Sequence, residues 1–314
     1  MILCLAGNPS IDKLFEVERI EVGEIHRPEQ FIQLPGGKGV HVAQVSAALG
    51  EATVVTGLLA GNTGRWIAEA LAEQGVQGHF AWGAGETRSS LSVADRQTGR
   101  LTEFYEDGTV ISGAEWRAVQ DIVLGLLSQA SWLALAGTMP PGAPVDGYAR
   151  LIADARRAGV PVAADTRADA LAHVVDAAPD LVKVNLREAG ELLGRELADA
   201  AQAAEAVREV RERCGGDGHA VAITLGEDGA VLIEPGGRAW RGCTAVTGTY
   251  PVGSGDTFLA GLLVGQVRGG SWCDALRLAL GAAAANAELP GAARFEAARA
   301  RELAAQAEVQ LLES

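Results

Sequence analysis

The segment Pro251-Val252-Gly253-Ser254-Gly255-Asp256-Thr257-Phe258-Leu259-Ala260-Gly261 suggests both the fold and the chemistry of this chain. Its glycines precede an apolar run that predicts a helix over about 256–267, and glycine lets the backbone approach a ligand closely. The free amides and the dipole of a helix start attract anions. Asp256 lies at the mouth of this predicted anion hole. A carboxylate there can cap the helix, but beside a phosphate cradle we favour a general base that deprotonates an attacking hydroxyl.

Length and composition limit the kinds of protein this chain can be. The 314 residues are 48% hydrophobic and include 40 glycines, which fits a globular α/β protein with many turns. The net charge of −14 argues against binding to nucleic acid or to an anionic membrane. The four cysteines have no Cys-x-x-Cys spacing, so no zinc site or disulfide framework is indicated. Without a basic leader or a run of roughly 18 apolar residues, we expect a cytoplasmic protein.

Most of the chain alternates short apolar strands with helices. This pattern is typical of a mostly parallel sheet that is covered by helices on both faces. Strands are predicted near residues 2–6, 54–59, 79–82, 132–136, 161–165, 181–184, 220–225 and 230–234. Helices are predicted near 40–49, 64–74, 114–130, 146–158, 198–213, 256–267 and 272–287. No long linker divides the chain, so we expect one domain over residues 1–314.

Two segments depart from the alternation of strands and helices. Residues 14–34 contain short strands of alternating apolar and charged residues, and residues 89–106 resemble a hairpin with a turn at 97–99. Alternation of this kind predicts a small sheet with one exposed face. We expect the two segments to pair with each other and to form a lid over the site. Pairing of this lid between the subunits of a homodimer is an additional hypothesis.

A second glycine-rich loop, Gly36-Gly37-Lys38-Gly39, precedes the predicted helix at 40–49. The spacing of a Walker A loop is absent from the chain, so a P-loop kinase is not indicated. The loop is either a flexible turn with a solvated lysine or a helix start that binds an anion or a sugar hydroxyl.

Lys183, Asn185 and Glu188 form a Lys-x-Asn-x-x-Glu pattern at the end of a predicted strand. Asn185 and Glu188 could help to hold a hydrated Mg²⁺ ion, although a capping interaction would use the same residues. Thr224-Leu225-Gly226-Glu227-Asp228-Gly229 is either a nucleotide-binding loop or an ordinary hairpin turn. Asp165 ends another strand, at the edge where parallel sheets bind ligands.

Together these motifs resemble, in order and approximate spacing, those of the ribokinase-like (phosphofructokinase-B type) carbohydrate kinases. The Pro-Val-Gly-Ser-Gly-Asp segment looks most like the branch that contains 1-phosphofructokinase and tagatose-6-phosphate kinase. The resemblance covers nearly the whole chain. It implies the family's fold, a three-layer α/β structure with a small β-sheet lid, and it implies that ATP and Mg²⁺ are used.

The resemblance also implies roles for individual residues. Asp256 would be the base, and Gly253, Ser254 and Gly255 would stabilise charge in the transition state. The residues implied to bind the sugar phosphate are Asp12, Gly36, Gly37, Lys38, Gly39, His41, Arg88, Ser90 and Thr138. Those implied to bind the nucleotide are Lys183, Asn185, Thr224, Gly226, Gly229 and Asn286, and Asn185 and Glu188 would hold the metal ion through water.

Two positions depart from the family pattern. His41 and Ser90 stand where the hexose-phosphate members have asparagines near the sugar. The phosphoryl-transfer chemistry is therefore better indicated than the particular sugar. A packed helix residue remains an alternative for His41, and an exposed arginine without a ligand remains one for Arg88.

The expected activity is phosphorylation by ATP of a ketohexose that already carries a phosphate. Fructose 1-phosphate is the first choice and tagatose 6-phosphate the second, with Lys38 and Arg88 as anchors. A kinase for unphosphorylated sugars or nucleosides is one alternative, and the two cations argue against it. A sugar sensor without catalysis is another, and the presence of Asp256 argues against it.

Overall fold

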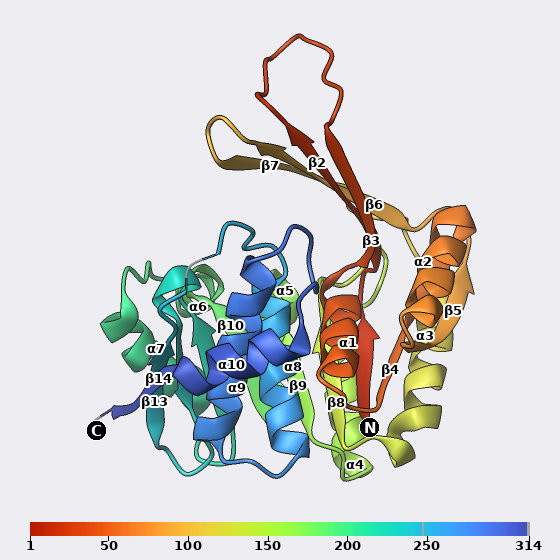
Figure 1. Cartoon of the computed structure of the whole chain (residues 1–314). Coiled ribbons are helices and arrows are strands. Elements are labelled where there is room, and N and C mark those ends of the chain that lie inside the picture. Colours follow the sequence, from red (N-terminus) through yellow and green to blue (C-terminus); the bar gives the residue numbers. More distant parts are fainter. Residues whose placement is uncertain (247, 313–314) are drawn as a thin grey trace.

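The computed structural model describes residues 1–246 and 248–312 (Figure 1). Its main sheet contains ten strands in the order β14-β13-β12-β11-β10-β9-β8-β1-β4-β5. The strands from β11 to β5 are parallel, and β12, β13 and β14 are antiparallel additions at one edge. Their bounds are Ile2–Ala6 (β1), Thr53–Ala60 (β4), Gln77–Gly83 (β5), Trp132–Ala136 (β8), Val162–Asp165 (β9), Leu181–Asn185 (β10), Ala220–Thr224 (β11), Ala230–Ile233 (β12), Ala239–Cys243 (β13) and Glu308–Leu312 (β14). The predicted mostly parallel sheet is confirmed.

Strand β1 shows why the central strands are continuous apolar runs. All five of its residues are buried, because helices cover both faces of the sheet. Ile2, Cys4 and Ala6 belong to the core on one face. Leu3 and Leu5 belong to the core on the other. The two-residue period of a strand thus divides one apolar run between two cores.

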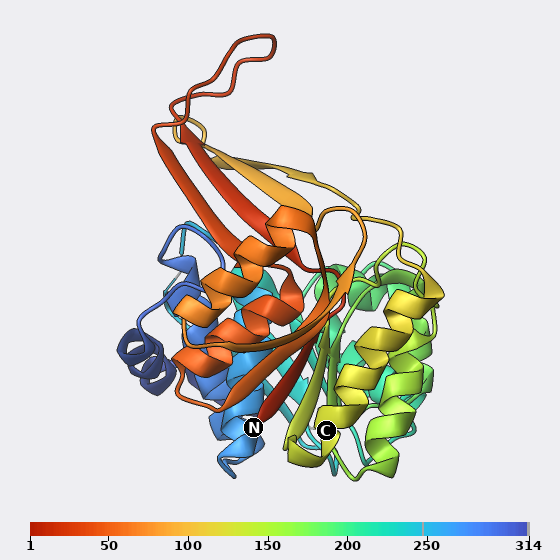
Figure 2. The ribbon, with the colours of Figure 1, turned by 90° about the vertical axis from the view of Figure 1, so that its right-hand side faces the viewer.

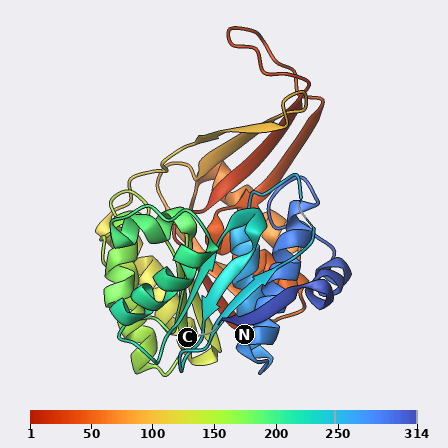
Figure 3. The same cartoon turned by 90° about the vertical axis from the view of Figure 1, so that its left-hand side faces the viewer.

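Helices form the two outer layers, which Figures 2 and 3 show from opposite sides. One layer contains α1 (Lys38–Ala48), α2 (Gly61–Glu73), α8 (Ser254–Val267), α9 (Trp272–Ala287) and α10 (Ala297–Gln306). The other contains α3 (Gly113–Leu126), α4 (Gly147–Arg157), α5 (Ala168–Asp176), α6 (Leu186–Leu193) and α7 (Ala200–Arg213). This arrangement is the predicted ribokinase-like three-layer fold.

A second sheet of four strands, in the order β3-β2-β6-β7, stands off the main body at the end where β1 finishes (Figure 1). Its strands are β2 (Ser10–Val17), β3 (Gln30–Gly36), β6 (Arg88–Asp95) and β7 (Arg100–Tyr105). The predicted pairing of the two segments is confirmed, although β2 begins at Ser10 rather than near residue 14. Parallel pairing of β2 with β6 sets Ser10 beside Arg88 and Asp12 beside Ser90.

The pattern of the sequence did not predict α5, α10, β13 or β14 as separate elements. Helix α5 has only nine residues, and β14 is an edge strand with mostly exposed side chains and therefore no apolar run. The predicted helix at 114–130 is α3 followed by a short 3₁₀ turn at Leu127–Gln129. Among the described residues, no helix combines the length and the apolar character that crossing a membrane would need.

Candidate active site

The helix predicted after the glycine turn is present as α8, with Gly253 as its N-terminal cap at φ 80°; its role as an anion hole stays a prediction. The amide of Ser254 donates a hydrogen bond to the carbonyl oxygen of Pro251 over 3.1 Å. The amides of Gly255 and Asp256 follow within the first turn, where a helix leaves its N–H groups without internal partners. These two amides are therefore the donors that this helix start offers to an anion.

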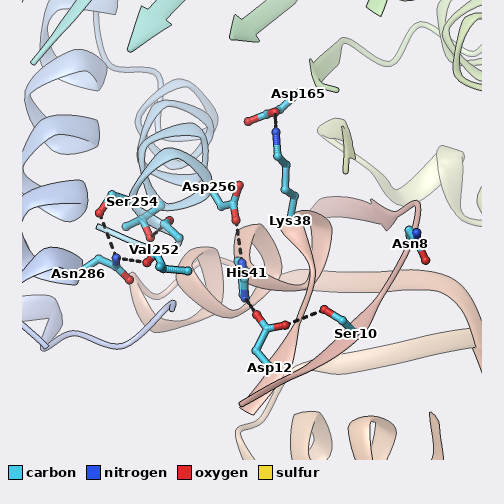
Figure 4. A network of polar contacts seen from close by, with 12 residues as sticks. Asn8, Ser10, Asp12, Lys38, His41, Asp165, Val252, Ser254, Asp256 and Asn286 are labelled. Atoms are coloured by element: carbon cyan, nitrogen blue, oxygen red, sulfur yellow. Dashed lines mark hydrogen bonds and ion pairs between the residues drawn. The ribbon is translucent and has the colours of Figure 1, made fainter. Parts of the chain in front are cut away.

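Two side chains hold the anion-hole turn in place. Ser254 donates its hydroxyl to the carbonyl oxygen of Ala283 on α9, and Asn286 donates its amide group to Val252 O at 2.9 Å and to Ser254 Oγ at 3.1 Å (Figure 4). Asn286 has no exposed surface. Its observed role is thus to support the turn, and the nucleotide binding that the family resemblance implies stays a prediction. The Ser254 hydroxyl is likewise used within the fold.

A buried cluster of charges lies where β9 and β10 end. Asp165, which is fully buried, accepts hydrogen bonds from Lys38 on its Oδ1 and from Lys183 on its Oδ2, the latter over 2.7 Å. The Nζ atom of Lys38 also lies 3.6 Å from Oε1 of Glu188. A single carboxylate therefore joins the lysine that begins α1 to the lysine of β10.

These contacts determine the charge states of the cluster. Burial disfavours the charged form of Asp165, but Lys183 and Lys38 outweigh it and lower the pKa of Asp165. Burial also disfavours the ammonium of Lys38, but Asp165, Glu188 and Asp256 outweigh it and raise the pKa of Lys38. The cluster is therefore a set of paired charges at the binding edge of the sheet.

His41 lies between the two carboxylates that were predicted to act on the sugar. Its Nδ1 is 2.7 Å from Asp256 Oδ2, and its Nε2 is 3.1 Å from Asp12 Oδ2 (Figure 4). Burial alone would favour the neutral ring, but the hydrogen bonds to Asp12 and Asp256 outweigh it and raise the pKa of His41 to about 10. The ring is 5% exposed. His41 is thus a buried helix residue that contacts two carboxylates, and its contact with a sugar stays a prediction.

Asp12 extends this network to the small sheet. Its Oδ1 accepts the hydroxyl of Ser10 at 2.7 Å. Burial favours its neutral form, but His41, Ser10 and Arg88 outweigh burial and lower the pKa of Asp12. A β-carbon on Gly36 would come within 2.1 Å of the Asp12 carboxyl carbon, so only glycine leaves room for that carboxylate.

A cavity of about 240 Å³ opens between the small sheet and the loop that leads to α8. Asp12 and Ser90 line it together with Lys13, Arg96, Tyr105 and Tyr250. The predicted sugar-binding residues Asp12 and Ser90 therefore face a cavity close to the anion hole. Tyr250 donates its hydroxyl to Glu16 at 3.1 Å and so connects this loop to β2.

Lys38 and Arg88, the two predicted phosphate anchors, contact different partners within the fold, and their contact with a phosphate stays a prediction. Lys38 contacts Asp165 and Glu188. Arg88 donates its guanidinium to the carbonyl oxygens of Asn8 and Glu106 and to the hydroxyl of Ser90, and it lines a separate cavity of about 30 Å³. The sequence could not predict the pairing of Lys38 with Asp165 or of Arg88 with Asn8, because these partners are 127 and 80 residues away along the chain.

Asn185 and Glu188 form a reciprocal capping box at the start of α6. Asn185 Oδ1 accepts from the Glu188 amide, and Glu188 Oε2 accepts from the Asn185 amide. Glu188 Oε1 remains beside Lys38. Two oxygens are thus used by the cap, and no group of three or more acidic, histidine or cysteine ligands occurs among the described residues. Glu188 Oε1 is the oxygen of this pair that could contact the water of a hydrated Mg²⁺, and the metal site stays a prediction.

The remaining predicted residues surround the same edge of the sheet. Gly37 and Lys38 begin α1, and Gly39 packs against β1. Thr138 follows β8 and is half-buried. Thr224, Gly226 and Gly229 form the turn that joins β11 to the antiparallel strand β12. This turn is a hairpin turn, and its contact with a nucleotide stays a prediction.

The three-layer fold, with a carboxylate at the start of α8, indicates a class of protein: an α/β phosphotransferase. Comparison with known proteins gives the family. The model of the pfkB family carbohydrate kinases matches residues 5–298. The chain belongs to this family, whose members transfer a phosphoryl group to an alcohol.

Individual relatives agree with the family assignment. A 1-phosphofructokinase of Rhodobacter capsulatus is 33% identical over 88% of this chain and 87% of its own length. An ATP-dependent 6-phosphofructokinase isozyme 2 of Mycobacterium tuberculosis is 30% identical over 97% of this chain and 90% of its own length.

Two solved structures share the fold. A possible 1-phosphofructokinase of Thermotoga maritima superposes with a TM-score of 0.90 at 19% identity and 99% coverage of both chains. Phosphofructokinase-2 of Escherichia coli, solved with substrates and products, gives 0.88 at 24% identity and 97% coverage of both chains.

Sequence reasoning missed two features of the site. It noted Asp165 only for its position at a strand end, and it did not identify Ser10 as a partner of Asp12. Glycine-rich motifs drew attention to residues that adjoin a ligand site, whereas Asp165 and Ser10 lie outside such motifs. The signal for Asp165 was a charged residue at the end of a buried strand, and the signal for Ser10 was its place in the segment Asn8-Pro9-Ser10-Ile11-Asp12.

Proposed function

We propose that this chain transfers the γ-phosphoryl group of ATP to a hydroxyl of a phosphorylated ketohexose. The observation that carries the proposal is that Asp12, from the small sheet, and Asp256, at the anion hole of α8, contact the same His41 ring. A sugar bound on Asp12 is thereby close to a carboxylate that lies beside a binding site for phosphate. Fructose 1-phosphate is our first choice of substrate and tagatose 6-phosphate our second. We include fructose 6-phosphate as a third candidate substrate, because the Mycobacterium tuberculosis relative is named a 6-phosphofructokinase.

In the proposed reaction the sugar hydroxyl oxygen attacks the γ-phosphorus and the bond to ADP breaks. Asp256 takes the hydroxyl proton, and the amides of Gly255 and Asp256 stabilise charge on the transferring group. Lys183, 3% exposed, adds a positive charge beside Gly255. Mg²⁺ would neutralise phosphate charge when bound, with Glu188 contacting its water.

A cytoplasmic location stays a prediction.

A panel of sugars in a coupled assay for ADP release tests the substrate. The panel contains fructose 1-phosphate, tagatose 6-phosphate, fructose 6-phosphate, free fructose and free tagatose, each with ATP and Mg²⁺. We expect the highest kcat/KM for one of the three phosphorylated sugars. A clear preference for free sugars would favour a kinase for unphosphorylated substrates. No turnover of any sugar, with binding retained, would favour a sensor.

We also propose that the small sheet is a lid and a dimer interface. Phe31 and Phe104 on this sheet are 55% and 61% exposed, which is unusual for large apolar side chains unless a partner covers them. The occupant we propose is the same sheet of a second copy of the chain. Light scattering should give a dimer for the wild type and a monomer for Phe104→Asp. A wild-type monomer at micromolar concentration would refute the interface.

A further inference from the structure

The imidazole of His41 forms a bridge between the carboxylates of Asp256 and Asp12. The family pattern has asparagine at this position, and an asparagine side chain would not reproduce the bridge. Both ring nitrogens contact carboxylate oxygens, at 2.7 Å from Asp256 and 3.1 Å from Asp12. An ionised carboxylate only accepts hydrogen bonds, so satisfying both contacts requires a proton on each ring nitrogen. The bridge is therefore an imidazolium between two carboxylates.

Two cations act on these carboxylates through space, Lys38 on Asp256 and Arg88 on Asp12, but among the described residues only His41 hydrogen-bonds to both. Asp12 reaches the ring from β2 and Asp256 from α8, where it is the only charged residue of the helix. Lys38, on α1 itself, is paired with Asp165. The other strands that pack on α1, namely β1, β3, β4 and β8, carry no charged side chain. His41 therefore separates two negative charges that would otherwise repel each other across a buried space.

We propose that His41 is a positioning residue: its imidazolium holds the carboxylates of Asp12 and Asp256 in one relative orientation, so that a sugar bound on Asp12 presents its hydroxyl to Asp256. The inference rests on the proposed function. Asp256 Oδ2 is engaged by the ring, which leaves Oδ1 to receive the proton of the sugar hydroxyl. Asp12 has 22% of its side chain exposed against 10% for Asp256, so the bridge joins the more open carboxylate to the more enclosed one.

In this proposal the bridge couples sugar binding to catalysis, because it sets the orientation of both Asp12, which binds the sugar, and Asp256, which takes the proton. An asparagine at position 41 could donate a hydrogen bond, but it carries no positive charge and each carboxylate would turn more freely. Misplacement of a reacting group by about 1 Å can cost roughly 100-fold in rate. We therefore expect His41→Asn to lower kcat by about tenfold to a hundredfold while KM for ATP changes little.

A histidine titration by NMR tests the bridge independently of any substrate. The signal of His41 among the five histidines is the one missing from His41→Asn. In the wild type we expect both ring nitrogens to remain protonated to above pH 9, and we expect Asp12→Asn and Asp256→Asn each to lower the pKa of the ring. A His41 signal that titrates near its ordinary value of about 6.5, or that ignores both substitutions, would overturn the bridge.

Kinetics then test the positioning role, with His219→Asn as the matched control. His219 is a partly buried histidine whose Nδ1 lies 2.8 Å from the Pro179 carbonyl oxygen, outside the site. The wild type should lose kcat/KM as pH rises towards 10, and His41→Asn should lack that loss. Equal pH profiles, or an unchanged kcat in His41→Asn, would overturn the positioning role. If the NMR titration shows the raised pKa of His41 but no sugar is phosphorylated, the proposed function is wrong. The bridge would then be present without a catalytic role.

Discussion

The ammonium of Lys183 lies directly in front of Gly255: a β-carbon at that glycine would come within 2.8 Å of the lysine Nζ. Gly255 therefore has two roles. It offers its amide to the anion hole, and it leaves the space in which a cation stands beside that hole. Because Lys183 is held by Asp165 at 2.7 Å, it cannot move aside without breaking a buried ion pair.

We expect Gly255→Ala to lower kcat by roughly 100-fold, because the new methyl group displaces Lys183 from the phosphate site. Helix propensity alone would make this substitution stabilising. The measurement is kcat with the preferred sugar phosphate, with Tm to check folding. Gly125→Ala on α3 is the matched control, since among the described residues no atom outside its own helix would lie within 4 Å of a β-carbon added there. Full activity in Gly255→Ala would show that the contact with Lys183 does not matter.

Asp256→Asn should lower kcat by about 10²–10⁴-fold, because the amide cannot take the hydroxyl proton. Binding of ATP and of the sugar phosphate should remain, since the amides of the anion hole are unchanged. Calorimetric titration gives the two affinities, and single-turnover kinetics give the chemical step. Near-normal turnover in a purified variant would refute the assignment of Asp256 as base.

Arg88→Ala should raise KM for the sugar phosphate more than it affects ATP binding. A hydrogen bond to a charged group contributes about 1.5–3 kcal/mol, or roughly 10- to 150-fold in affinity. The same change should have little effect on residual activity with free fructose or tagatose, which carry no phosphate. Arg150→Ala, an exposed arginine paired with Asp146 on α4, is the control. Equal losses on phosphorylated and free sugars would mean that Arg88 only supports the fold through Asn8 and Glu106.

Asp165→Asn should destabilise the protein by about 3–5 kcal/mol, because it leaves the buried Lys183 and the half-buried Lys38 without their common carboxylate. Chemical denaturation measures the loss. Asp180→Asn is the matched control, since Asp180 accepts a hydrogen bond from the Val162 amide at the opposite end of β9 but is exposed. A similar stability for both variants would indicate that the cluster around Asp165 is well solvated.

The raised pKa of His41, about 10, predicts how stability depends on pH. A group whose pKa is higher in the folded state stabilises that state fully below its unfolded pKa, here about 6.5. That contribution is lost as pH rises through the folded pKa. The free energy of unfolding of the wild type should therefore fall between about pH 6.5 and 10 more steeply than that of His41→Asn. Parallel curves for the two proteins would contradict a charged His41.

The sequence by itself determined the alternating strands and helices, because buried parallel strands must be short apolar runs. It also located the start of α8 at Gly253 and Ser254, because a glycine turn followed by an apolar run is typical of a helix start. The contacts of His41, Lys38 and Arg88 depended on the tertiary structure. His41 and Asp256 are 215 residues apart, and Lys38 and Asp165 are 127 apart. Local spacing carries no information about such pairs. Only the packing of α1 against α8 and the sheet decides which charges meet.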